Sequence, residues 1–333
     1  MKFGDTPLAE AEGAILAHGL KGDGVAFKKG RVLTRDDVDT LRRVGKTSVL
    51  AARIEASDMP EDAAAAAVAN AAAGEHLKVS AAFTGRCNLF ADARGLAVVD
   101  VERLNRLNLV DEAITVATVP PYLAVEPRQM VATIKIIPFA APKAAVAACA
   151  KIAGDGGPLV RVAPFRSRRV GLVQTLLPGT KPSVVENTVA TTRARVAALG
   201  SELVAAVTCD HAAAALQAAI ARLRGQGAEM ILVLGASAIV DRRDVIPAAI
   251  VAEGGEVVHF GMPVDPGNLL LLGRIGTQPV VGLPSCARSP KLNGFDFVLR
   301  RLAAGIELGA ADLRAMGVGG LLGEIPSRPS PRA

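Results

Sequence analysis

The chain has 333 residues and a formal net charge of +6; 50% of its residues are hydrophobic, only 3% are aromatic, and tryptophan is absent. One tyrosine among scattered basic residues cannot supply the basic stripe with stacking aromatics that nucleic-acid binding requires, and the widely spaced cysteines exclude a disulfide framework or a zinc site. No secretory signal opens the chain and no apolar run approaches the ~20 residues of a membrane span, so we expect a cytoplasmic protein without nucleic-acid or membrane partners.

The first half of the chain is expected to form an α+β module over residues 1–160. Pro7 to His18 has a helical signature, and Thr34 is a good N-cap for a helix over Arg35–Val44. The alanine-rich segment after Pro60 predicts a long helix, because alanine has the best intrinsic helix propensity. Further elements are strands at 46–53, 96–99, 113–119 and 130–137, a helix at 144–152, and a glycine-rich hinge at 154–158.

From about Pro164 onward strands and helices alternate, which is typical of α/β folds with a doubly wound parallel sheet. We expect this domain to span residues 161–323, and the Pro-, Ser- and Arg-rich residues 324–333 to be a disordered tail. The predicted strands are 169–175, 203–208, 230–234, 256–260 and 280–283, and the predicted helices are 184–199, 211–224 and 245–253.

Small and polar residues follow these strands, and the loops after parallel strands share the edge of the sheet where ligands bind. Gly235-Ala236-Ser237 comes directly after an apolar strand and is either a phosphate cradle, with the Ser237 hydroxyl as donor, or an ordinary tight turn. Asp241 could coordinate magnesium or position a phosphoryl group. Asp244 could do the same or cap the following helix.

The loop after the last strand carries Arg288 and Lys291 on either side of Ser289. These cations either bind an anionic ligand group or are solvent-exposed charges. Cys286 is expected to be a small buried residue, since no base is readable beside it. Asp210 ends a strand at the ligand edge, and His211 after it is expected to be a helix-start residue.

This order of motifs resembles the molybdopterin-binding domain shared by molybdopterin adenylyltransferases, molybdopterin molybdenumtransferases and gephyrin. The likeness covers roughly residues 165–300, and its motifs are Glu186-Asn187, Asp210, the loop 235–244, Pro266-Gly267 and Gly282-Leu283-Pro284. The first half resembles the N-terminal part of molybdopterin-binding proteins that are sometimes fused to a nucleotidyltransferase. That likeness lies in residues 10–18, 28–31 and 84–89.

The resemblance implies that the chain binds molybdopterin or its nucleotide form in molybdenum cofactor biosynthesis or transfer. It leaves open whether the chain is an enzyme; if it is one, the resemblance implies a transferase acting on molybdopterin by molybdenum insertion or nucleotidyl transfer, with Asp241 and Asp244 as catalytic residues and Asp241 as a magnesium ligand. It also implies a homodimer, in which Thr84, Arg86 and Asn88 could reach a neighbour's ligand, and a separate nucleotidyltransferase or molybdoenzyme as partner. The implied cofactor-binding residues are Gly235, Ala236, Ser237, Asn187, Asp210, Pro266, Gly267, Ser285, Arg288, Ser289 and Lys291.

Two departures from the family keep other functions open. The first loop, Leu176 to Pro182, lacks the acidic pair that helps molybdenumtransferases hold magnesium or molybdate. No Gly-rich nucleotide loop of the fused transferases is found. One alternative is a non-catalytic carrier or sensor of the cofactor, and another is a nucleotide-binding enzyme that reuses the fold.

Overall fold

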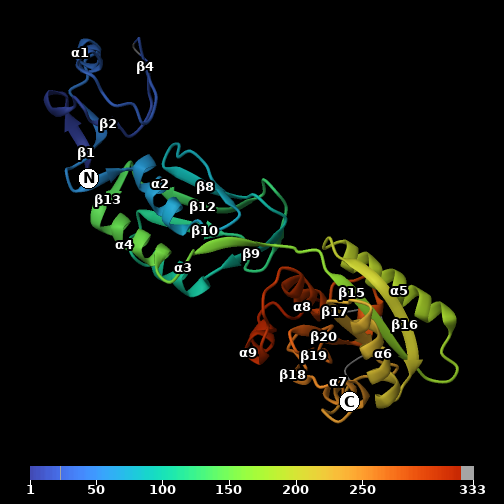
Figure 1. Cartoon of the computed structure of the whole chain (residues 1–333). Helices are drawn as coiled ribbons and strands as arrows, with labels where there is room; N and C mark the ends of the chain where they lie inside the picture. Colours follow the sequence, from blue (N-terminus) through green and yellow to red (C-terminus); the bar gives the residue numbers. More distant parts are fainter. Residues whose placement is uncertain (23, 324–333) are drawn as a thin grey trace, which may run out of the picture. The chain divides into compact units, whose positions relative to one another are not determined.

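The computed structural model describes residues 1–22 and 24–323, and the chain divides into two compact units, Met1–Ala163 and Pro164–Ala333. Figure 1 shows the helices and strands of both units. Buried hydrophobic residues form a core within each unit. The predicted domain boundary after residue 160 lies close to this division. The predicted tail at 324–333 lies outside the described residues.

The first unit begins with a small antiparallel sheet in the order β1-β5-β2, built from Lys2–Pro7, Ser48–Arg53 and Ile15–Leu16. The predicted helix from Pro7 to His18 is wrong, because only Leu8–Glu10 makes a single 3-10 turn. Gly13 adopts a left-handed conformation (φ 79°), which a right-handed helix cannot accommodate, and the chain turns there into β2.

Helix α1 (Arg35–Arg43) begins at the predicted N-cap, Thr34, which forms a capping box with Asp37. The Thr34 hydroxyl accepts from the backbone N–H of Asp37 at 3.3 Å, and the Asp37 carboxylate accepts from the Thr34 N–H at 3.1 Å. Both Asp37 oxygens also accept from Arg31, at 2.8 and 2.9 Å. The predicted N-cap is therefore confirmed, and a bidentate ion pair reinforces it.

The rest of the first unit packs helices against an antiparallel sheet in the order β10-β12-β8-β7. The sheet consists of Ile114–Thr118, Met130–Ile136, Arg86–Ala91 and Leu77–Val79. The other elements are β3 Leu20–Gly22, β4 Val25–Phe27, β6 Asp58–Pro60, α2 Glu61–Ala72, β9 Gly95–Val99, α3 Val101–Asn108, β11 Ala124–Val125, β13 Ala140–Pro142, α4 Lys143–Gly154 and β14 Val160–Pro164.

The second unit is built on a six-stranded sheet in the order β16-β15-β17-β20-β19-β18. All of its strands run parallel except β19, which is antiparallel to both of its neighbours. The parallel-rich α/β sheet confirms the broad fold class, while β19 was missed in the sequence. The strands are β15 Arg169–Leu176, β16 Glu202–Asp210, β17 Met230–Leu234, β18 Glu256–Phe260, β19 Leu271–Ile275 and β20 Gln278–Leu283.

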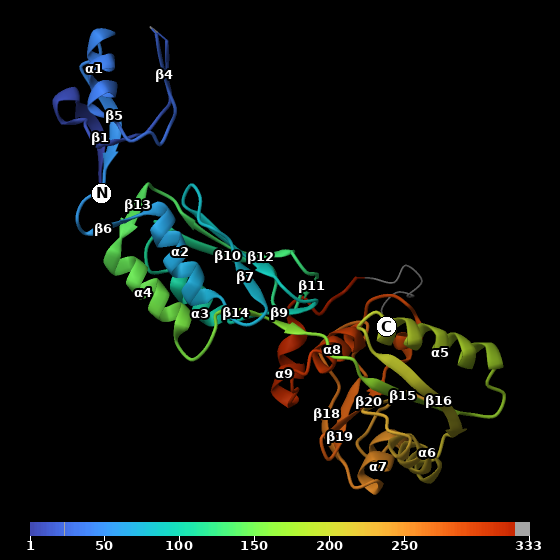
Figure 2. The same cartoon turned by 45° about the horizontal axis from the view of Figure 1, so that its top comes forward.

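Helices cover both faces of this sheet (Figure 2). Alternate residues of β17 show the two layers: Leu232 and Leu234 pack under α5 and α8, and Ile231 and Val233 pack under α6 and α7. The helices are α5 Pro182–Ala197, α6 Ala213–Gly225, α7 Val245–Ala252, α8 Gly294–Ala303 and α9 Ala310–Arg314, with 3-10 turns η2 Ser285–Arg288 and η3 Ala315–Gly317. In the described part of the chain, no helix combines the length and apolarity needed to cross a bilayer.

Candidate functional site

One buried hydroxyl connects the carboxyl ends of three parallel strands. Thr175, near the end of β15, is 1% exposed. Its Oγ1 accepts the backbone N–H of Ala236 after β17 at 2.9 Å, and lies 2.8 Å from Nδ1 of His211 after β16. The loops after these strands therefore share one edge of the sheet, where α/β folds place their ligands.

The turn after β17 is tight, and most of its groups are engaged within the protein. A Cβ on Gly235 would lie 2.6 Å from the Ser237 carbonyl oxygen, so only glycine fits there. The Ala236 N–H is donated to Thr175 rather than to the solvent side. Ser237 is exposed, and its hydroxyl makes only a weak 3.5 Å contact with the Ala238 carbonyl. In the predicted cradle, Ser237 is the side chain best placed to meet a ligand.

Asp241 and Asp244 both have partners in the loop that leads into α7. Asp241 accepts from the Arg243 side chain at 2.9 Å and from its backbone N–H at 2.8 Å, and the side-chain bond holds the pKa of Asp241 below its usual range. Asp244 caps α7, accepting from the N–H groups of Val245 at 2.7 Å and Val240 at 3.2 Å. The capping interpretation is confirmed, while catalytic roles for both residues stay predictions.

Magnesium through Asp241 also stays a prediction. Within residues 1–22 and 24–323, no group of three or more His, Cys, Asp or Glu side chains is arranged to hold a metal ion. A magnesium ion at Asp241 would have to draw its remaining ligands from water and from a bound phosphate, which is how Mg²⁺ is commonly held at phosphate sites.

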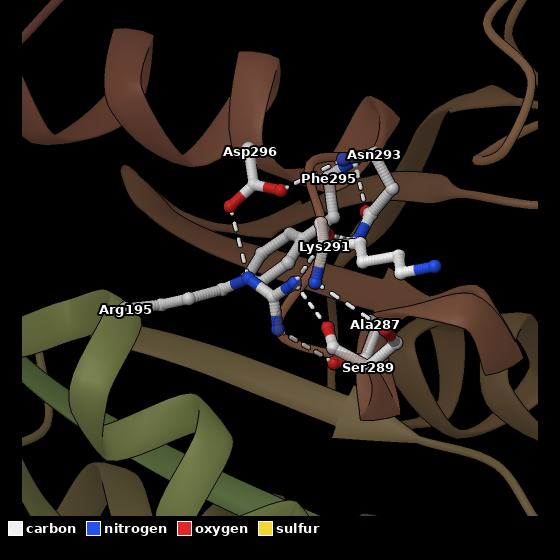
Figure 3. A network of polar contacts seen from close by, with 7 residues as sticks. All are labelled: Arg195, Ala287, Ser289, Lys291, Asn293, Phe295 and Asp296. Carbon is white, nitrogen blue, oxygen red and sulfur yellow. Dashed lines mark hydrogen bonds and ion pairs between the residues drawn. The ribbon is translucent and has the colours of Figure 1, made fainter. Parts of the chain in front are cut away.

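Arg195, on α5, fixes the loop between β20 and α8 (Figure 3). Its guanidinium donates to the carboxylate of Asp296 at 2.9 Å and to the carbonyls of Ala287 at 2.7 Å, Lys291 at 2.9 Å and Ser289. The side chain is 8% exposed. The planar fork of arginine suits donation to several acceptors at once, so one residue sets the course of the loop that carries Arg288 and Lys291.

Arg288 differs from Arg195, because among the described residues no carboxylate pairs with it. Its Nη1 donates at 3.0 Å to the hydroxyl of Thr188, which in turn donates to the Val184 carbonyl at 2.7 Å. Burial lowers the pKa of the half-buried Arg288 guanidinium. A partly desolvated cation with a neutral partner is suited to an anionic ligand.

Gln174 contacts the same turn of α5 from the sheet side. It is 2% exposed, and its amide donates to the Val185 carbonyl at 3.2 Å, while its Oε1 is buried without a donor. An unmet buried acceptor costs about 1–3 kcal/mol and is uncommon in native proteins. Gln174 and Arg288 thus leave one acceptor and one cation incompletely satisfied around residues 184–188.

The remaining predicted residues lie on the same edge with different exposures. Asn187 on α5 and Asp210 at the end of β16 are exposed, as are Ser285 and Lys291. Ser289 accepts from the Lys291 N–H at 3.3 Å. The exposed groups are accessible to a ligand; their binding roles stay predictions.

Pro266 and Gly267 lie against the start of α8. The Gly294 N–H donates to the Pro266 carbonyl at 2.8 Å, and a Cβ on Gly267 would lie 2.6 Å from the Gly294 nitrogen. The turn therefore shapes the backbone next to the loop that Arg195 fixes.

Cys286 is half-buried, and burial raises the pKa of its thiol, as expected for a packing residue. In the first unit, Thr84 and Arg86 are exposed near a two-residue turn, with Thr84 at φ 49°. The Asn88 amide oxygen accepts from the Thr133 hydroxyl at 2.7 Å.

Two hollows of about 420 and 600 Å³ lie at the opposite edge of the sheet of the second unit. Residues at the amino ends of its strands line both, including Arg168, Thr277 and Pro279. Their position does not coincide with the loops after the parallel strands, and we place the candidate site at those loops on the basis of strand direction and side-chain chemistry.

Comparisons with known proteins add little to this site. Residues 5–53 match the family described as Domain of unknown function (DUF8806). No curated protein matches the chain. A crystal structure of a molybdopterin biosynthesis MoeA protein from Pyrococcus horikosii is similar with 13% identity and a TM-score of 0.32, covering 91% of this chain and 75% of that chain. So low a score supports no statement about activity.

Proposed function

We propose that the second unit binds molybdopterin or its nucleotide form at the carboxyl edge of its parallel strands, and that the protein acts in molybdenum cofactor biosynthesis or transfer. The observation that carries the proposal is Arg288, a half-buried cation without a carboxylate partner among the described residues, at the edge where Thr175 joins three strand ends. The resemblance of residues 165–300 to the molybdopterin-binding domain supports the choice of ligand.

The residues at this edge fit an anionic, hydrogen-bonding ligand. Arg288 and the exposed amine of Lys291 supply positive charge, and Ser237 supplies a hydroxyl. When bound, molybdopterin supplies a dithiolene for the metal and a phosphate. We assign Arg288 and Lys291 to its anionic groups and Ser237 to a phosphate oxygen.

Binding without turnover is favoured over transfer by the acidic residues of the loops. The first loop, Leu176 to Pro182, has no carboxylate, Asp244 caps a helix, and Asp241 makes only an exposed surface pair with Arg243. A transferase would need Asp241 to exchange Arg243 for magnesium or substrate. We therefore propose a carrier of the cofactor first and a molybdopterin transferase second, working as a homodimer with a separate nucleotidyltransferase or molybdoenzyme.

A titration of the full-length protein with molybdopterin and with adenylylated molybdopterin tests this proposal. We expect Arg288→Ala to weaken binding at least about tenfold, since hydrogen bonds to charged groups contribute about 1.5–3 kcal/mol. Arg222→Ala is the matched control, because it removes an exposed charge near the C-terminus of α6. Binding of ATP without binding of either pterin would instead favour a nucleotide-binding enzyme that reuses the fold.

A further inference from the structure

The imidazole of His211 is held in one orientation by a buried neighbour. His211 follows β16 directly, and its backbone N–H donates to the Leu176 carbonyl at 3.1 Å. Its Nδ1 lies 2.8 Å from Oγ1 of Thr175. The ring is half-buried, and among the described residues no group accepts a hydrogen bond from its Nε2.

The proton of the Thr175 hydroxyl decides the tautomer of this ring. Oγ1 already accepts the Ala236 N–H at 2.9 Å, and Thr175 is 1% exposed, so solvent does not take its proton. Within the described chain, Nδ1 of His211 is the acceptor at hydrogen-bond distance. If Nδ1 carried a proton, the hydroxyl proton would be buried without an acceptor, at a cost of about 1–3 kcal/mol.

We propose that Thr175 holds His211 as the neutral Nε2–H tautomer, and that His211 donates this N–H to a phosphate oxygen of a ligand bound at the carboxyl edge of the sheet. Thr175 is then the positioning residue and His211 the binding residue. The phosphate belongs to the ligand of the proposed function, and that part of the inference rests on it. The assignment of the tautomer does not depend on the proposed function. It depends on the contacts of Thr175 with Ala236 and His211 and on the bond from the His211 N–H to the Leu176 carbonyl.

The start of α6 near His211 favours an anion. Thr175 links the ring to the backbone of Ala236, the residue before the exposed Ser237. Helix α6 begins two residues after His211 without a side-chain cap and without an acidic residue in its first turn, while the exposed carboxylate of Asp210 directly precedes His211. Unfilled N–H groups at a helix start favour a phosphate on the α6 side of the ring, away from Asp210.

Long-range ¹H–¹⁵N correlation spectra of the full-length protein at about pH 8, where imidazoles are generally neutral, report the tautomer directly. The chain has four histidines, and His211→Gln assigns the signals of this one. We expect an unprotonated Nδ1 and a protonated Nε2 in the wild type and in Thr175→Ser, and loss of this preference in Thr175→Val. A protonated Nδ1 in the wild type would overturn the proposal.

Titration with inorganic phosphate tests the donor role in the same spectra. We expect phosphate to shift the Nε2 signal, His211→Phe to weaken phosphate binding about tenfold, and His211→Gln, which keeps an amide donor, to weaken it less. An Nε2 signal unmoved by saturating phosphate would refute the donor role even if the tautomer is as stated. The probe is inorganic phosphate, so the two tests are independent. A protein that does not bind molybdopterin would contradict the proposed function, while the phosphate titration would still test the donor role of His211.

Discussion

The Nε–H of Arg195 on α5 donates to Oδ1 of Asp296 on α8 at 2.9 Å, across 101 residues of sequence. The two side chains are 8% and 11% exposed. The second oxygen of Asp296 accepts from the Asn293 N–H at 2.9 Å, so the same carboxylate belongs to the capping box of α8. One buried ion pair thus joins a helix to the start of another and fixes the loop between them.

Removing Arg195 should therefore destabilise the second unit strongly. Arg195→Ala leaves a buried carboxylate and three carbonyl oxygens without their donor, and we expect it to lower the free energy of unfolding by about 3–5 kcal/mol. Arg195→Lys keeps the charge but not the fork, and should recover only part of this loss. Urea unfolding followed by circular dichroism gives the free energy of unfolding of each variant.

Arg193→Ala is the control, since Arg193 is exposed on the same helix and should change stability by less than about 0.5 kcal/mol. Equal effects of Arg193→Ala and Arg195→Ala would show that the Arg195 network does not fix the loop.

Two substitutions of Asp244 distinguish a capping role from a catalytic role. Asparagine caps helices about as well as aspartate, so Asp244→Asn should keep the stability of the wild type, while Asp244→Ala should lose about 1 kcal/mol. Thermal unfolding gives both values. If molybdopterin turnover is found and Asp244→Asn abolishes it at unchanged stability, the carboxylate has a chemical role beyond the cap.

The ion pair of Asp37 with Arg31 predicts an acid-sensitive first unit. Hydrogen bonds from Arg31 hold the pKa of Asp37 below its usual range. A folded-state pKa below the unfolded one adds stability that is complete above the ordinary Asp pKa of about 3.9 and is lost as pH falls through the folded-state value. Urea midpoints between about pH 7 and pH 2 should fall less steeply in Asp37→Asn than in the wild type. Parallel pH profiles would contradict this.

Gly267 should tolerate a side chain less well than another glycine with positive φ. A Cβ added at Gly254 has no atom within 4 Å, so Gly254→Ala should lower the free energy of unfolding only by the ~1–2 kcal/mol that a left-handed alanine costs. At Gly267 the added Cβ would lie 2.6 Å from the Gly294 nitrogen, and we expect a loss of roughly 3 kcal/mol. The difference in urea midpoint between the two variants is the readout, and a difference near zero would rule out a tight contact.

Elements with a uniform local pattern were predictable from the sequence. Strand β17, Met230–Leu234, matches its prediction because every side chain in it is apolar and buried. Strand β19, Leu271–Ile275, was missed because Gly273 and Arg274 interrupt its apolar pattern. The predicted helix from Pro7 to His18 failed because Gly13 and the pairing of β2 with β5 override local propensity.

The candidate site was predictable at its loops but not at the side chains that organise them. Thr175 lies 36 residues from His211 and 61 from Ala236, and no local spacing pattern signals such contacts. The sequence around Arg195 predicts a helix, but it does not predict the contacts that this side chain makes with the loop before α8. The signal for Gln174 was a polar residue inside an apolar strand, which predicts a buried amide in need of partners.

The most direct test of the central claim is the affinity of the full-length protein for molybdopterin and its adenylylated form, with and without magnesium. Binding that Ser237→Ala and Arg288→Ala each weaken, but Arg222→Ala does not, would place the ligand at the carboxyl edge of β15, β16 and β17 as proposed. No binding at tens of micromolar, or binding insensitive to these substitutions, would contradict it.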